Sequence, residues 1–150
     1  MQRAFTLIEL MVAIALLAVL IGVAVPSYQS FIAAQRVRAT VSDLHGDLVL
    51  ARSEAVKRNR SMILTGHSSG WAAGWTLANP VAGQPDLISH SAVTGVEIEA
   101  SAVQVQFSAS GRVATAVTFE VSSAIGDEEA KISCLALGTD GRVTSSNEGC

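Results

Sequence analysis

Few side chains in this 150-residue sequence have the types and spacing that catalysis requires. The segment Gly66-His67-Ser68-Ser69-Gly70 fits the Gly-x-Ser-x-Gly pattern of a hydrolase nucleophile elbow, which stands between a strand and a helix. The residues that follow, Trp71-Ala72-Ala73-Gly74-Trp75, instead predict a loop that enters a strand. The segment is therefore interpreted as a polar turn. Neither a pair of catalytic carboxylates nor a phosphate-binding glycine loop is identifiable, so the chain is not predicted to be an enzyme.

Metal and cofactor chemistry find equally little support in the sequence. His45, His67 and His90 have no metal-ligand spacing with one another or with the cysteines. Asp127-Glu128-Glu129 is an acidic run, and such runs are solvated loops by default. We expect no metal and no cofactor.

Cys134 and Cys150 are the two cysteines of the chain. Because an apolar segment precedes them, we expect an exported domain in an oxidising compartment and a disulfide between them. Closing that ring is worth roughly 3 kcal/mol in the chain-entropy model.

Glu9 is the carboxylate in the most unusual surroundings. It is followed by Leu10–Val25, which contains no charged or hydrogen-bonding side chain. As a helix, residues 5–25 would be about 30 Å long, enough to cross a bilayer core. A carboxylate costs about 2.5–3.5 kcal/mol at the bilayer centre, and less near its surface. Glu9 is interpreted either as a residue with its head in interfacial water or as a residue that pairs with a positive group when helices bundle.

The composition supports a membrane segment joined to one modest domain. The chain is 49% apolar and 15% charged, against about 25% charged in typical soluble domains. This hydrophobicity excludes intrinsic disorder, and the length excludes a large two-domain enzyme. Residues 36–60 are net basic, whereas residues 61–150 carry three basic and nine acidic side chains. An acidic domain is a poor surface for non-specific nucleic-acid binding.

Residues 26–60 predict a second, amphipathic stretch of the same helix. Six apolar residues recur at spacings of four and three, which is one helical face: Val37, Val41, Leu44, Leu48, Ala51 and Ala55. Pro26 is expected to kink or locally break the helix. This apolar face of the helix must pack against another part of the protein.

From Ser61 onward the pattern changes to short strands separated by Gly, Pro, Ser and Asp. Strands are predicted at 61–65, 74–78, 87–91, 96–99, 103–107, 113–121 and 131–137. Antiparallel sheets need one face covered, and the amphipathic helix can cover it.

The N-terminal motif Ala4-Phe5-Thr6-Leu7-Ile8-Glu9-Leu10 resembles the class III signal of type IV pilins and type II secretion pseudopilins. The resemblance implies that a prepilin peptidase cuts between Ala4 and Phe5 and that Phe5 is N-methylated. It also implies that Glu9 pairs with the terminal amine of a neighbouring subunit during assembly, and that Pro26 is the helix kink. The family usually has Gly before the cut, and Ala4 is the smallest substitute for it.

The remainder of the chain resembles the GspH/FimT-like branch of this family. The shared features are a basic turn after the helix, the Trp71–Trp75 segment, and the turns Gly111-Arg112-Val113 and Gly141-Arg142-Val143. The tryptophans are predicted to have a structural role in the core or at a strand edge. The two arginines are predicted to face solvent or a carboxylate.

The expected fold is therefore α+β, a pilin-like lollipop with a long N-terminal helix packed on a small antiparallel head. Residues 1–4 form the leader, residues 5–25 the transmembrane and fibre-core helix, residues 26–60 the amphipathic helix, and residues 61–150 the periplasmic head. The expected location is the bacterial inner membrane, single-pass, with incorporation into a pilus or pseudopilus.

The resemblance implies a minor pilin that acts in pilus priming or at the tip. Its expected partners are other pilins, the prepilin peptidase and the inner-membrane assembly platform. A secretion pseudopilin H is the alternative. DNA binding through Arg142 is a weaker one, because Gly141-Arg142-Val143-Thr144 lacks the second arginine of DNA-binding relatives. A membrane-tethered enzyme or sensor is a third alternative. The missing catalytic residues argue against an enzyme, and the sequence around Glu9 argues against a simple membrane anchor.

Overall fold

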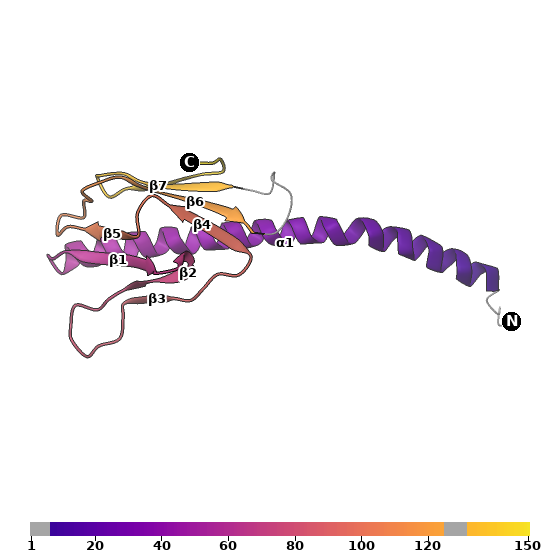
Figure 1. The fold of residues 1–150 in the computed structure, drawn as a ribbon, viewed down its shortest axis with the longest axis horizontal. Coiled ribbons are helices and arrows are strands. Elements are labelled where there is room, and N and C mark those ends of the chain that lie inside the picture. The colour runs from indigo at the N-terminus through magenta and orange to yellow at the C-terminus, as the bar shows by residue number, and fades with distance from the viewer. Residues whose placement is uncertain (1–6, 125–131) are drawn as a thin grey trace. The chain divides into compact units, whose positions relative to one another are not determined.

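The computed structural model describes residues 7–124 and 132–150, with residues 23–27 described by their backbone alone (Figure 1). It divides into two compact units, Met1–Ile32 and Ala33–Cys150. One helix, α1 (Leu7–Lys57), belongs to both units. The helix continues through position 26 without a break, and the kink at Pro26 stays a prediction.

The second half of α1 packs on the sheets through the predicted apolar face. Leu44, Leu48, Ala51 and Ala55 are completely buried, and Val37 is nearly so, whereas Val41 is partly buried. A fully buried Leu side chain contributes about 1.5–3 kcal/mol relative to an exposed one. The amphipathic pattern therefore identified the face that holds the helix on the head.

The helix ends at Lys57 rather than at residue 60 because of its C-terminal cap. Asn59 adopts a left-handed conformation with φ of 47°. The Arg60 N–H donates a hydrogen bond of 3.1 Å to the Ala55 carbonyl, as in a Schellman motif. This cap turns the chain back toward the first strand.

The head contains two four-stranded antiparallel sheets (Figure 1). The first has the order β3-β2-β1-β5 and the second the order β4-β6-β7-β8. The strands are β1 (Met62–His67), β2 (Gly70–Leu77), β3 (Ile88–His90), β4 (Val96–Ala100), β5 (Gln104–Phe107), β6 (Val117–Ser123), β7 (Ser133–Leu137) and β8 (Val143–Ser146).

Two strand starts and one whole strand differ most from the sequence prediction. Strand β2 begins at Gly70, so the predicted loop at Trp71–Ala73 is part of the strand. Strand β6 begins at Val117 rather than at residue 113, because residues 108–112 form a turn and Val113 makes an isolated bridge to Phe107. Strand β8 was not predicted.

The predicted disulfide joins Cys134 of β7 to Cys150, with their Cα atoms 5.1 Å apart. The Cys150 N–H also donates a hydrogen bond of 3.0 Å to the Glu120 carboxylate on β6. Together these contacts fix the last residue of the chain on the second sheet. A chain end rich in Ser, Asn and Gly would otherwise fray.

Candidate functional site

Glu9 lies in the first turn of α1, on a stretch of helix whose apolar side chains are exposed. A carboxylate in this turn is favourably placed, because the helix dipole is positive at its N-terminus. The eleven large apolar side chains described between residues 7 and 22 are 52–77% exposed: Leu7, Ile8, Leu10, Met11, Val12, Ile14, Leu16, Leu17, Val19, Leu20 and Ile21. Contiguous apolar surface of this kind marks an interaction or membrane surface.

The predicted cleavage and methylation residues, Ala4 and Phe5, lie outside the described residues, as does the acidic run at 127–129. Within the described part of the chain, no helical segment is both long and apolar enough to span a membrane. Among the same residues, no group of three or more His, Cys, Asp or Glu side chains is placed to hold a metal ion.

The hydrolase-like segment forms a hairpin, as its interpretation as a polar turn predicts. Gly66 and His67 end β1, Gly70 begins β2, and Ser68 and Ser69 form the turn between them. No helix follows the serines, so the geometry of a nucleophile elbow is not formed.

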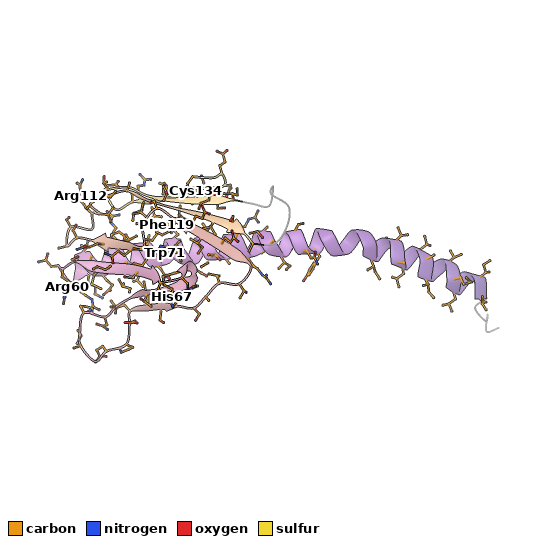
Figure 2. All side chains as sticks on the ribbon, viewed as in Figure 1. Arg60, His67, Trp71, Arg112, Phe119 and Cys134 are labelled. Atoms are coloured by element: carbon orange, nitrogen blue, oxygen red, sulfur yellow. A yellow bond between two sulfur atoms is a disulfide. The ribbon has the colours of Figure 1, made fainter. Side chains whose placement is uncertain are left out.

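The Trp71–Trp75 segment builds the core, in agreement with its predicted structural role. Trp71 packs edge-on against Phe119, with ring centroids 4.8 Å apart, and its indole N–H donates to the Ala102 carbonyl (Figure 2). Trp75 is 1% exposed, and its indole N–H donates a hydrogen bond of 2.7 Å to Asp47 on α1. The segment therefore links the first sheet to the second sheet and to the helix.

Sequence reasoning missed the contacts that surround Trp75. His90 of β3 stacks on the Trp75 ring at 3.9 Å, and its Nε2 lies 3.6 Å from the Asp43 carboxylate. Gly74 is required beside this stack, because it adopts φ of 110° and a Cβ there would overlap the His90 carbonyl. The only signal in the sequence is the spacing of Asp43 and Asp47, which places both carboxylates on one helix face.

The two Gly-Arg turns lie side by side at the end of the head where α1 ends. In each, the glycine N–H donates a 2.8 Å hydrogen bond to the carbonyl three residues earlier, Gly111 to Ser108 and Gly141 to Gly138. Arg52 of α1 donates from its guanidinium to the Asp140 carbonyl, which ties the helix to the second turn.

Both turn arginines are exposed, as predicted. Figure 2 shows Arg112 and Arg60 at this end of the head. The Arg142 backbone N–H donates to the Asp140 carboxylate, which fixes the turn. DNA binding by Arg142 stays a prediction.

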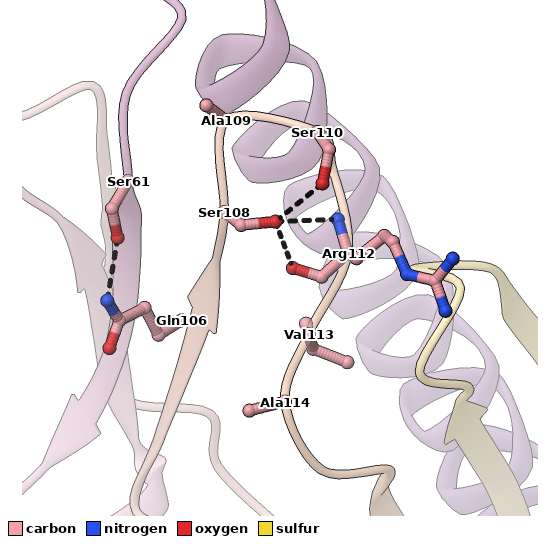
Figure 3. Close-up of a pocket in the computed structure, with 8 residues that line it drawn as sticks. All are labelled: Ser61, Gln106, Ser108, Ala109, Ser110, Arg112, Val113 and Ala114. Carbon is pink, nitrogen blue, oxygen red and sulfur yellow. Dashed lines mark hydrogen bonds between the residues drawn. The ribbon is translucent and has the colours of Figure 1, made fainter.

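A groove of about 500 Å³ beside the first turn contains hydroxyl and amide side chains (Figure 3). Ser108 Oγ donates to the Arg112 carbonyl and accepts from the Arg112 N–H, and Gln106 donates to Ser61. Figure 3 shows the Arg112 guanidinium pointing away from Ser61 and Gln106. These polar groups satisfy one another, so the groove does not assemble a nucleophile with a base.

Glu54, near the end of α1, carries a shifted pKa. Its carboxylate accepts a hydrogen bond from Arg58, and this bond is the main reason that the pKa of Glu54 lies below its usual value near 4.5. Burial opposes the shift, and Lys57 adds to it through a second hydrogen bond of 3.4 Å. The pair stabilises the last turn of the helix.

A carboxyl group whose pKa is depressed in the folded state stabilises the protein above its unfolded pKa, and this stability is lost as the pH falls through the folded pKa. We expect the melting temperature of the wild type to fall more steeply below about pH 4.5 than that of Glu54→Gln. Glu148→Gln, at an exposed position, is the control and should follow the wild type. Parallel curves for the wild type and Glu54→Gln would contradict the role of this pair.

Two family models together match most of the chain. The family model described as type II transport protein GspH matches residues 40–141. The prokaryotic N-terminal methylation motif matches residues 1–25. Among curated proteins, none matches this chain in sequence.

Solved structures of pilin-like proteins share the fold. The type IV minor pilin FimU of Pseudomonas aeruginosa matches with a TM-score of 0.64 and 20% identity, covering 75% of this chain and 89% of that chain. A second crystal form of FimU gives a TM-score of 0.61. The minor pseudopilin EpsH of the Vibrio cholerae type 2 secretion system matches with a TM-score of 0.59 and 15% identity, covering 75% and 97%.

These structural likenesses show a pilin fold, with a long helix packed on antiparallel sheets. The GspH family model covers more than half of the chain, and the methylation motif covers residues 1–25. The chain therefore belongs to the GspH family of type IV pilin and pseudopilin proteins.

Proposed function

We propose that this chain is a minor pilin of a type IV pilus, held in the inner membrane by residues 5–25 before it enters the fibre. The observation that carries this proposal is the exposed apolar surface of α1 around Glu9, which lies within the residues that match the N-terminal methylation motif. Such a surface must be covered by lipid or by other helices. Lipid covers it in the membrane, and the helices of neighbouring subunits cover it in the fibre.

In this proposal the head has a specialised role in the fibre, in priming or at the tip, and no catalytic role. Its buried tryptophans and its turns serve packing, and the groove of Figure 3 satisfies its own polar groups. Cleavage between Ala4 and Phe5 by a prepilin peptidase and methylation of Phe5 precede assembly in this proposal.

A pseudopilin of a type II secretion system is the second candidate, favoured by the GspH model and the likeness to EpsH. The disulfide between Cys134 and Cys150 favours the pilus.

Photo-crosslinking in the native host separates these two systems. Tyr28 is 66% exposed on α1, so a photoreactive phenylalanine replaces it conservatively. We expect ultraviolet light to join this position to pilins of the pilus. Crosslinks to pseudopilins would show that the chain belongs to the secretion system and not to the pilus. If neither class of protein is crosslinked, the assembly role is rejected. The same variant kept without ultraviolet light is the negative control.

A further inference from the structure

A second groove, of about 310 Å³, lies between α1 and the edge strand β8. On the helix side it is lined by Arg38, Ser42 and His45. Their spacing of four and three residues places all three side chains on one face of the helix. We name this feature the α1–β8 groove.

Serines occupy the sheet side of the α1–β8 groove, and one of them, Ser133, is buried. On β7, Ser133 shares the core-facing side of the strand with Leu135 and Leu137, because side chains alternate every two residues. On β8, Ser145 is paired with Leu135 and therefore lies on the same side. Both serines line the groove. At this edge of the second sheet, hydroxyl side chains therefore take the place of apolar ones.

Ser133 is only 8% exposed, and its hydroxyl has no hydrogen-bond partner among residues 7–124 and 132–150. Within the same residues no buried side-chain polar atom is sealed off without a partner, so this hydroxyl opens onto the groove. This hydroxyl is therefore free to bond with a ligand in the groove.

The groups that meet in the α1–β8 groove are mainly hydrogen-bond donors. Arg38 offers a guanidinium, His45 a ring N–H, the serines their hydroxyls, and Asn147 an amide. Among residues 7–124 and 132–150, no acidic side chain lines the groove, and the Arg38 and His45 side chains make no hydrogen bond or ion pair. The complementary ligand carries negative charge and acceptor oxygens.

We propose that the α1–β8 groove binds a small organic anion through its carboxylate or phosphate group. The oxyanion lies between Arg38 and His45 and accepts hydrogen bonds from Ser133 and Ser145. A volume of about 310 Å³ exceeds one oxyanion, so the rest of the molecule occupies the groove beside Asn147. This site does not depend on how the chain assembles.

The test is calorimetric titration of the full-length protein, in uncharged detergent, with inorganic phosphate and with succinate at constant ionic strength. We expect at least one of them to bind, and Arg38→Gln and His45→Gln each to weaken its binding by about tenfold or more. Arg36→Gln is the matched control, because Arg36 is exposed on the same helix and does not line the groove. It removes the same charge and should leave the affinity within about twofold.

Ser133→Ala separates a ligand site from a structural one. The variant should weaken binding about threefold or more while its melting temperature stays the same or rises, since it removes a hydroxyl that the chain does not pair. Absence of binding by both anions overturns the proposal. An equal loss in Arg36→Gln and Arg38→Gln also overturns it, because general surface charge then explains the binding.

Discussion

Glu9→Gln should leave the protein in the membrane fraction and reduce its incorporation into sheared fibres by at least about tenfold. The proposed function assigns the Glu9 carboxylate to the terminal amine of a neighbouring subunit. Breaking a buried ion pair by removing one partner costs about 3–5 kcal/mol, because the other charge is left unpaired. A loss of this size is more than a tenfold change in an association constant.

The direction of this effect separates the two interpretations of Glu9. If the Glu9 carboxylate only lies in water at the membrane surface, its replacement removes a cost of membrane insertion. Incorporation of the protein into fibres should then stay the same or increase. If the carboxylate docks a neighbour, incorporation falls although insertion becomes easier. The measurement is an immunoblot of sheared fibres and membranes from the same cells.

Two controls make the Glu9 result specific. Met11→Ala shortens an exposed apolar side chain two residues away and should reduce incorporation far less. Intact mass of the membrane form should show that both variants lose residues 1–4 and gain one methyl group, as the wild type should. Unchanged incorporation of correctly processed Glu9→Gln would refute the assembly role of the carboxylate.

Periodic features of the fold were predictable from the sequence. The apolar face from Val37 to Ala55 repeats every three or four residues, and the structure buries it. Alternation identified β5 and most of β6 in the same way. The Cys134–Cys150 disulfide was predictable because the chain offers no other pair of cysteines.

Features that depend on distant residues were not predictable. Strand β8, Val143–Ser146, has three consecutive hydroxyl residues and no apolar alternation, so it forms only because β7 pairs with it. Without β8, neither the α1–β8 groove nor the position of Ser145 beside it could be predicted. The contact of Trp75 with Asp47 joins residues 28 positions apart, and no local pattern encodes it.

Gly141→Ala should be among the most destabilising single substitutions in the head. Gly141 adopts φ of 76°, and a Cβ there would overlap the Gly111 carbonyl oxygen and lie 3.0 Å from the Arg52 guanidinium nitrogen. The left-handed conformation alone costs a residue with a Cβ about 1–2 kcal/mol. Overlap with a backbone atom cannot be relieved by rotating a side chain, so we expect a total loss of at least about 3 kcal/mol.

Gly83→Ala is the matched control for the backbone conformation. Gly83 has nearly the same φ, 78°, but a Cβ there would meet no atom within 4 Å. It should lower the melting temperature by a few degrees, whereas Gly141→Ala should lower it by roughly 10 °C, at about 2–4 °C for each kcal/mol. If the melting temperatures of the two full-length variants fall by the same amount, the contact between Gly141 and Gly111 contributes nothing to stability.

The damage should extend beyond the turn, because the two Gly-Arg turns connect the sheets. The first turn follows β5 of the first sheet, and the second joins β7 to β8 of the second sheet. The Val113 N–H donates a hydrogen bond of 3.2 Å to the Thr139 carbonyl, so backbone atoms of the two turns are bonded directly. Arg52 anchors the second turn to α1. Separating the turns therefore loosens the helix and both sheets together, and hydrogen exchange in Gly141→Ala should increase at β5 and β8 as well as at the turn itself.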